Sequence, residues 1–254
     1  MIRLDQVGFS YRDGQPVLSE VSVEIPGGLT LLLGPNGCGK STLLKIAAGV
    51  EQPDQGRVEV DGHDLWTDEA EARRTLAYVP EQPDLTPYAT VREILGLVCR
   101  LRGVPRQIAK ETAEQALALV GLDRLAHRSV RELSMGQRRR AVLAAARIGT
   151  PAHLLLDEPL EAMDRGARED ILAWIGNRLA AGAAVVVVSH DIEPFAPLAD
   201  RAFTVRDGRC LSSGELPGDP GERMVVLERL ARGTALTPSP SPGRTPGPPG
   251  EGGV

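Results

Sequence analysis

A stretch of nine residues from Gly34 to Thr42 has the side chains and the spacing that a polyphosphate requires. It reads Gly34-Pro35-Asn36-Gly37-Cys38-Gly39-Lys40-Ser41-Thr42 and fits G-x-x-x-x-G-K-[ST]. In such a loop, backbone N–H groups and the N-terminus of the next helix point at one spot, which suits an anion. Lys40 can reach the β/γ-phosphates, Ser41 can ligate Mg²⁺, and Thr42 can approach the α-phosphate. The stretch therefore predicts a binding site for a nucleoside triphosphate.

Two carboxylates follow an apolar run later in the chain. Residues His153 to Leu156 are typical of a buried strand, and Asp157 and Glu158 come directly after them. At the carboxyl edge of a parallel sheet, beside a phosphate loop, Asp157 would hold Mg²⁺ through water. Glu158 would then be placed to polarise an attacking water molecule.

The elements that must position these residues alternate between strands and helices. Apolar residues 29–33 predict a buried strand before the glycine loop, and residues 43–48 predict a helix after it. Strands are also predicted at 2–9, 17–25, 75–79, 153–156 and 184–188, with another pair flanking Asp61-Gly62, and helices from 137, at 167–179 and at 222–230. These segments predict an α/β core.

A helical stretch interrupts this core. Thr90 and Glu93 form a capping box before a one-sided apolar pattern, and Pro105 opens a second helix that Gly121 closes. We expect a helical insertion at about residues 83–142, within an ATPase domain that spans residues 1–232. Residues 233–254 hold six prolines and six glycines among Ser and Thr, a composition that predicts a disordered tail.

The composition of the chain indicates which partners and which cellular compartment to expect. The chain has 254 residues, 42% of them hydrophobic, and a formal net charge of −5, which argues against broad binding to nucleic acid. Three scattered cysteines fit a reducing compartment, and no apolar N-terminal signal or membrane-spanning run is present. These features predict a cytosolic chain. The most concentrated basic run is Arg138-Arg139-Arg140, and we expect these side chains to lie on a solvated face of a helix.

The segment Leu133-Ser134-Met135-Gly136-Gln137, just before a predicted helix, adds a second phosphate-binding surface: a hydroxyl, a glycine N–H and a helix N-terminus. This segment resembles the signature motif of ABC (ATP-binding cassette) proteins, and the chain resembles their nucleotide-binding subunits over residues 2–214. The resemblance implies a P-loop NTPase core with an N-terminal antiparallel β-subdomain and an inserted helical subdomain. It also implies ATP and Mg²⁺ as ligands.

Further residues match the family's pattern. Tyr11 matches the aromatic side chain on which adenine stacks, and Asp164 ends the loop that crosses the dimer interface. His190 matches the histidine that contacts the γ-phosphate and the attacking water. The resemblance thus implies catalytic roles for Lys40, Glu158 and His190, and nucleotide contacts from Ser134, Gly136, Gln137 and Asp164.

Two positions depart from that pattern. Family members usually carry Gln directly after a strand such as Tyr78-Val79-Pro80, but here Glu81 stands there and Gln82 follows. A carboxylate near Mg²⁺ would hold the metal more strongly but repel the γ-phosphate. We expect Glu81 to occupy the position, as a nucleotide contact and metal ligand, with Gln82 as the alternative. Met135 replaces a more frequent Gly, which the motif should tolerate.

The resemblance also implies how the protein works. Two copies, or this chain and a homologous one, meet head to tail, and each ATP lies between one Lys40 loop and the other Ser134 surface. The first hypothesis is the ATPase subunit of a membrane transporter, docked on a separate permease at the inner face of the membrane. Pro80-Glu81 and the segment from Leu101 onward are similar to the ABC-2-type exporter branch, and an importer stays open. The second hypothesis is a soluble ABC ATPase, such as an iron–sulfur assembly subunit, and the third is a P-loop kinase.

Overall fold

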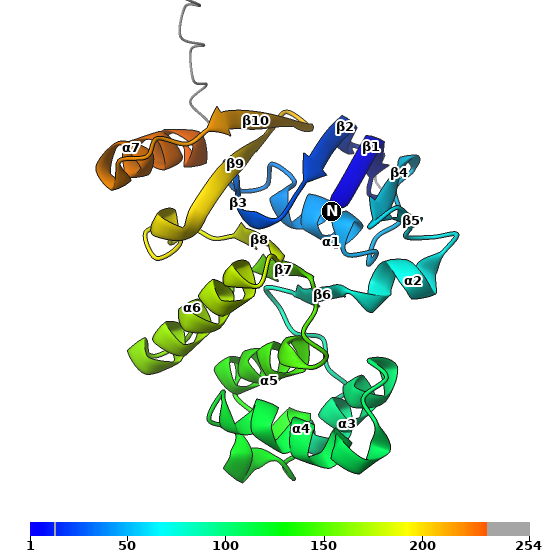
Figure 1. The fold of residues 1–254 in the computed structure, drawn as a ribbon. Coiled ribbons are helices and arrows are strands. Elements are labelled where there is room, and N and C mark those ends of the chain that lie inside the picture. The colour runs from blue at the N-terminus through cyan, green and yellow to red at the C-terminus, as the bar shows by residue number, and fades with distance from the viewer. Residues whose placement is uncertain (13, 233–254) are drawn as a thin grey trace, which may run out of the picture.

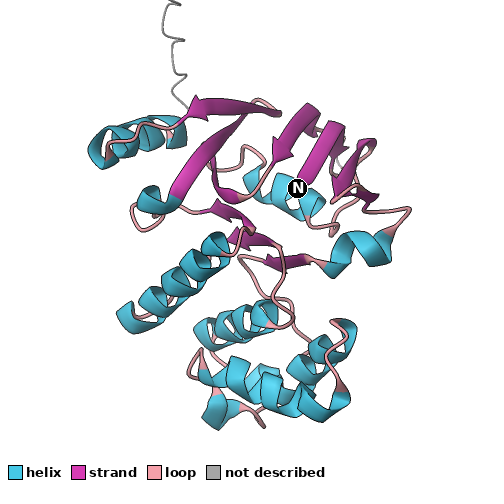
Figure 2. Ribbon diagram, viewed as in Figure 1, coloured by secondary structure: helices cyan, strands magenta, loops and turns pink. Residues whose placement is uncertain are grey.

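The computed structural model describes residues 1–12 and 14–232, which fold into two β-sheets with helices around and between them (Figures 1 and 2). The predicted disordered tail at 233–254 lies outside the described residues. Helices α3 (Val91–Leu101), α4 (Arg106–Ala118) and α5 (Met135–Arg147) gather into a separate lobe below the sheets in Figure 1.

The larger sheet carries the carboxylates and the glycine loop. Its strand order is β10-β9-β3-β8-β7-β6, and the bounds are β3 (Gly28–Leu33), β6 (Leu76–Val79), β7 (His153–Asp157), β8 (Ala184–Val188), β9 (Ala199–Arg206) and β10 (Arg209–Glu215). Strands β3, β8, β7 and β6 pair in parallel. Every residue of β7 and β8 is buried, as expected for strands covered on both faces. Their carboxyl ends therefore lie along one edge.

The smaller sheet is antiparallel, with the order β2-β1-β4-β5. Its strands are β1 (Ile2–Ser10), β2 (Pro16–Ile25), β4 (Gln55–Val60) and β5 (His63–Asp64). Helix α1 (Lys40–Ala47) packs between the two sheets, because its apolar side chains share a core with inward residues of β1, β2 and β4 and with one face of the larger sheet.

The opposite face of the larger sheet is covered by α6 (Arg165–Ala180) and α7 (Pro220–Ala231). Alternate strand residues divide between the two cores: Leu155 and Val186 face α1, while Leu154 and Val185 face α6 and α7. This layering holds the carboxyl edge of the sheet rigidly on both sides.

The helical lobe has its own apolar core, formed by α3, α4, α5 and the turns between them. The Thr90–Glu93 capping box is present, with both reciprocal hydrogen bonds. Helix α2 (Glu69–Arg74) and strands β9 and β10 were not predicted from the sequence. No helix in the described part of the chain is both long and apolar enough to cross a membrane.

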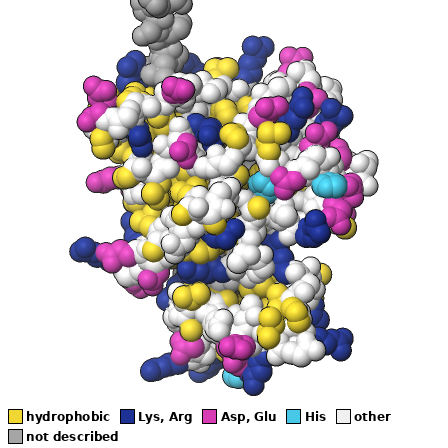
Figure 3. Space-filling view, viewed as in Figure 1, with side chains coloured by type: hydrophobic (Ala, Val, Ile, Leu, Met, Phe, Trp, Pro, Cys, Tyr) yellow, Lys and Arg dark blue, Asp and Glu magenta, His cyan; other side chains and the backbone are white. Residues whose placement is uncertain are grey.

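The prediction that Arg138-Arg139-Arg140 forms a solvated helix face is wrong. Arg139 is only 3% exposed. Arg138 donates to the carbonyl oxygen of Val130 at 3.1 Å, and Arg140 donates to that of Val120 at 3.4 Å. All three guanidinium groups are thus committed to contacts within the protein. Figure 3 shows Lys and Arg side chains along the waist between the helical lobe and the rest.

Candidate active site

The glycine loop between β3 and α1 adopts a backbone that few residue types allow. Gly34, Gly37 and Gly39 have φ values of 135°, 76° and 105°. A Cβ added at Gly34 would lie 2.4 Å from the carbonyl oxygen of Val205, so only glycine fits there. Gly39 caps α1 without any side-chain hydrogen bond. The first amides of α1 are therefore directed at the loop, as an anion site requires.

Lys40 places a buried positive charge in this loop. The residue is 8% exposed, and its Nζ donates to the carbonyl oxygens of Gly34 and Pro35, each at 2.9 Å. Backbone carbonyls satisfy the donors but supply no full counter-charge, so a polyphosphate at the loop would be strongly favoured.

Tyr11 is brought to the same loop from the end of β1. Its hydroxyl lies 3.2 Å from Oγ1 of Thr42, and its ring packs edge to face on Phe9 with centroids 5.0 Å apart. The side chain remains 42% exposed. An exposed aromatic face beside the phosphate loop can stack on a base.

Ser41, Asp157 and Glu81 form the candidate metal side. Asp157 is 2% exposed, and its Oδ1 has no hydrogen-bond partner among the described residues. Burial raises the pKa of Asp157; a hydrogen bond from Ser41 opposes this shift and the nearby Glu81 carboxylate adds to it. An orphaned buried carboxylate oxygen beside a hydroxyl and a second carboxylate is a donor set that suits Mg²⁺. Because no group of three or more His, Cys, Asp or Glu side chains forms a metal cluster in the described ranges, phosphate and water would complete the coordination.

Glu158 follows β7 directly and is held by the two residues that follow the neighbouring strand β8. Its Oε1 accepts from the backbone N–H of His190 at 2.8 Å, and its Oε2 accepts from the Ser189 hydroxyl at 3.1 Å. The His190 ring is largely exposed, with Nε2 3.7 Å from Oε1 of Glu158. Burial raises the pKa of Glu158, with His190 opposing the shift. Its φ of 48° is strained for a non-glycine residue. A fixed carboxylate with a raised pKa is suited to general-base chemistry.

The second predicted surface lies at the N-terminus of α5. Oγ of Ser134 accepts from the N–H of Gln137 at 3.3 Å, and Oε1 of Gln137 accepts from the N–H of Ser134 at 2.9 Å. Ser134 is exposed. A Cβ at Gly136 would lie 3.1 Å from the carbonyl oxygen of Ala162, so the glycine permits a close approach of that loop. Within the described residues, no hydrogen bond or ion pair joins this surface to the Lys40 loop.

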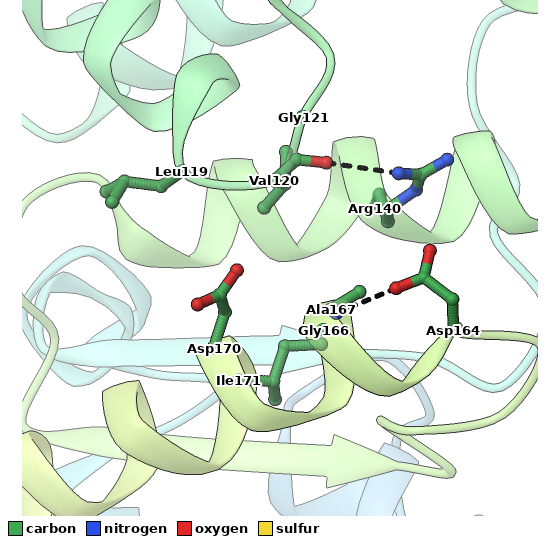
Figure 4. Close-up of a pocket in the computed structure, with 9 residues that line it drawn as sticks. All are labelled: Leu119, Val120, Gly121, Arg140, Asp164, Gly166, Ala167, Asp170 and Ile171. Atoms are coloured by element: carbon green, nitrogen blue, oxygen red, sulfur yellow. Dashed lines mark hydrogen bonds between the residues drawn. The ribbon is translucent and has the colours of Figure 1, made fainter.

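Asp164 caps α6 by accepting from the N–H of Ala167 at 2.9 Å. Figure 4 shows this bond below Arg140 and its hydrogen bond to the carbonyl of Val120; these residues line a cavity of about 270 Å³. Asp164 is thus positioned on a helix N-terminus near the helical lobe, and no described contact links it to the Glu158 group.

The structure therefore divides the predicted residues into two groups. Lys40, Ser41, Thr42, Tyr11, Asp157, Glu158, Glu81 and His190 lie around one sheet edge, while Ser134, Gly136, Gln137 and Asp164 lie apart. No described contact draws Gln82 to the edge. Two residues were missed from the sequence: Ser189, which buries a hydroxyl against Glu158, and Arg139. In the sequence, the one feature that could have pointed to Ser189 is its position directly after an all-apolar strand.

Comparison with known protein families gives one match, to the family described as "ABC transporter", over residues 18–161. Among similar proteins, the sulfate/thiosulfate import ATP-binding protein CysA of Gloeobacter violaceus is 35% identical over 245 residues, covering 94% of this chain and 70% of the relative. The molybdenum import ATP-binding protein ModC of Rhodopseudomonas palustris is 40% identical over 218 residues, covering 80% and 56%. Other relatives are covered to 54–65% of their length, so the chain spans little more than half of most of them.

Solved structures share the fold. One described as the ATP-binding subunit of an ABC transporter superposes with a TM-score of 0.78 at 24% identity, covering 89% of this chain and 94% of that one. A dimeric post-hydrolysis state of the ATP-binding cassette MJ0796, bound to ADP and Pi, superposes with a TM-score of 0.77 at 29% identity, covering 86% and 100%. The predicted α/β P-loop architecture with an antiparallel β-subdomain is confirmed.

Proposed function

Since this chain belongs to the ABC transporter family, we propose that it binds and hydrolyses ATP to power a transporter whose membrane-spanning subunit is a separate protein. The observation that carries the proposal is the meeting of the buried Lys40 ammonium and the Asp157–Glu158 pair along one sheet edge. A strongly charged triphosphate needs both neutralisation and an oriented water, and these groups are chemically suited to supply them.

In this mechanism the loop amides and Lys40 bind the phosphates, and Tyr11 stacks on adenine. Ser41, Asp157 and Glu81 would hold Mg²⁺, which neutralises phosphate charge when bound. Glu158 takes a proton from the attacking water, and its hydrogen bonds from Ser189 and His190 keep its Oε atoms in place. The exposed His190 ring is free to contact the γ-phosphate.

Among the described residues of one chain, no hydrogen bond or ion pair links Ser134 to the Lys40 loop, so we propose that a second ATPase subunit supplies that surface. A Ser134 hydroxyl that accepts from Gln137 still has its own proton to donate to a phosphate oxygen. The related cassette MJ0796 was solved as a dimer. The pairing of Lys40 loop with Ser134 surface, and the interfacial role of Asp164, follow from this arrangement.

A cleft between the two lobes supports docking on a permease. It has a volume of about 670 Å³ and is lined by the segment just after α1 and by α2, β6 and the end of α3. The lining includes Val50, Arg73, Val98, Leu101 and Arg102. Val50 is 54% exposed and Leu101 is 76% exposed. Apolar side chains at a concave surface, flanked by arginines, fit an amphipathic helix from a membrane subunit. Such docking would place the chain at the inner face of the cell membrane.

The direction of transport depends on that partner. The similar proteins named above are import ATP-binding proteins, whereas the expectation of an exporter rests only on Pro80-Glu81 and the segment after Leu101. The comparisons do not support the exporter branch, and we propose import as the direction to test first. They do not favour the soluble iron–sulfur alternative.

A pull-down of the tagged full chain from detergent-solubilised membranes of the source cell tests the proposal, with cytosol as the control. We expect a polytopic protein in about stoichiometric amount, and we expect Leu101→Asp to lose it while retaining ATP binding. Recovery only from cytosol, with soluble factors, would contradict the transporter assignment but not the ATPase site.

A further inference from the structure

The buried Arg139 joins three segments that the proposed mechanism treats separately. It lies on α5, five residues after Ser134. Its Nη1 donates to Oε2 of Glu161 at 2.8 Å, and its Nη2 donates to the backbone carbonyl oxygen of Glu81. One guanidinium thus connects the helix of the Ser134 surface, the loop after β6 and the turn after β7.

Both partners sit next to groups of the ATP site. The Glu81 carbonyl belongs to the residue whose carboxylate lies near Asp157. Glu161 follows Glu158 by one turn, and its N–H donates to the Glu158 carbonyl oxygen at 3.2 Å. A displacement of α5 that carries Arg139 would therefore pull on both the metal side and the base side of the site.

The environment of Arg139 makes these contacts costly to break. Its side chain is 4% exposed, whereas that of Glu161 is 56% exposed. Its Nε has no hydrogen-bond partner among the described residues. A buried guanidinium cannot deprotonate and must keep its remaining acceptors. A planar guanidinium that donates from two nitrogens to two different acceptors fixes direction as well as distance, which a lysine cannot do.

We infer that Arg139 is a positioning residue that couples the placement of Ser134 on α5 to the Glu81 loop and the Glu158–Glu161 turn of the same chain. It acts through these segments and touches no nucleotide. This inference rests on the proposed function, in that the Ser134 surface serves the ATP of the second subunit. When α5 is packed in the position that this structure shows, Arg139 holds the Glu81 loop and the Glu158–Glu161 turn in fixed positions relative to it.

The test compares four full-length variants: Arg139→Met, Arg139→Lys, Glu161→Gln and a control, Arg147→Met. Arg147 is a suitable control because it is a half-buried arginine of the same helix, with its guanidinium 5.1 Å from the centroid of the Trp174 ring and no hydrogen bond or ion pair to either loop among the described residues. Each variant is measured for fluorescent-ATP affinity, for kcat and KM, and for Tm.

We expect Arg139→Met to lower kcat by about tenfold, the effect of losing one or two charge-assisted hydrogen bonds, with nucleotide affinity unchanged. Arg139→Lys should recover part of the loss, because one contact can be kept. Glu161→Gln should lower kcat by a smaller factor, since the Glu81 contact remains. Arg147→Met should lower Tm without lowering kcat at a temperature where it is folded.

Equal losses of kcat in Arg139→Met and Arg147→Met would mean that Arg139 only stabilises the fold, and would overturn the inference. An unchanged kcat in both Arg139→Met and Glu161→Gln would also overturn it. Backbone hydrogen exchange, measured without nucleotide, tests the same contacts by a readout that does not depend on ATPase activity. Arg139→Met should speed exchange in peptides covering residues 80–88 and 158–164 but not in β2. Should the wild-type chain hydrolyse no ATP, the proposed function fails, and this readout still decides whether the guanidinium holds both loops.

Discussion

The N-termini of α1 and α5 are the two candidate phosphate-binding surfaces of the molecule, and they are built in opposite ways. Helix α1 begins at a glycine with positive φ, has no side-chain cap, and starts with the buried Lys40. Helix α5 begins at the exposed Ser134, whose capping box with Gln137 satisfies two backbone amides, those of Ser134 and Gln137. The first surface is incomplete without an anion, while the second is stable without one.

This difference indicates a division of labour. The α1 surface concentrates charge and unsatisfied donors, so it should dominate nucleotide affinity. The α5 surface offers the Ser134 hydroxyl proton, the Gly136 N–H and a helix dipole, each worth little alone in water. It should contribute mainly when a second subunit excludes water around it, since electrostatic interactions strengthen in a dry interface.

The largest expected effect comes from keeping both surfaces engaged on ATP that cannot be hydrolysed. Glu158→Gln should lower the ATPase rate by about 10²–10⁴-fold, because it removes the proton acceptor and keeps the shape. It should also accumulate an ATP-bound dimer, as measured by light scattering with ATP and Mg²⁺. The exposed Glu193→Gln is the matched control and should behave as wild type. A variant that stays monomeric would count against the two-surface arrangement.

The next prediction distinguishes the contributions of the α1 surface and the α5 surface to nucleotide affinity. Lys40→Met should weaken ATP binding by roughly 10–100-fold, since it removes a buried charged donor. Ser134→Ala should leave the affinity of the single subunit unchanged and lower kcat by about tenfold, with a loss of ~1 kcal/mol from the cap. Ser129→Ala removes another hydroxyl of the same lobe, one bonded to the Pro87 carbonyl, and serves as control. Equal affinity losses in Lys40→Met and Ser134→Ala would refute the division of labour.

The α1 surface was more predictable from sequence than its surroundings. Continuous patterns such as Gly34 to Thr42 and the Thr90–Glu93 box depend on local backbone geometry, and both appear as expected. Strands β9 and β10 were not predicted because polar residues interrupt them. Pairing of β9 with β3, and of β10 with β9, overrides their weak pattern. Arg139 was misinterpreted because its two partners are 58 and 22 residues away in the chain. No local pattern reports a contact of that kind.

A smaller effect distinguishes Glu81 from Gln82 at the metal side of the α1 surface. The Glu81 carboxylate lies close enough to raise the pKa of Asp157. Glu81→Ala should increase the Mg²⁺ concentration for half-maximal activity by roughly 3–10-fold, as expected for one lost weak ligand. Gln82→Ala should not change it. The reverse pattern in a Mg²⁺ titration would assign the position to Gln82.

The smallest effect is on stability, and it tests whether the charged form of Glu158, at the same sheet edge as the α1 surface, destabilises the fold. Because burial raises the folded-state pKa of Glu158 above its usual 4.5, the neutral form is favoured in the fold. The associated stability is present below pH 4.5 and is lost as the pH rises through the folded-state pKa. Glu158→Gln mimics the neutral form, so we expect it to raise Tm by a few °C, on the order of 1 kcal/mol, at pH 7.5. The difference should shrink toward zero as the pH falls below 4.5, whereas Glu193→Gln should show none at either pH. A difference in Tm between Glu158→Gln and wild type that stays constant at all pH values would mean that the shape of the side chain, and not its charge, causes the effect. The buried carboxylate would then not destabilise the fold.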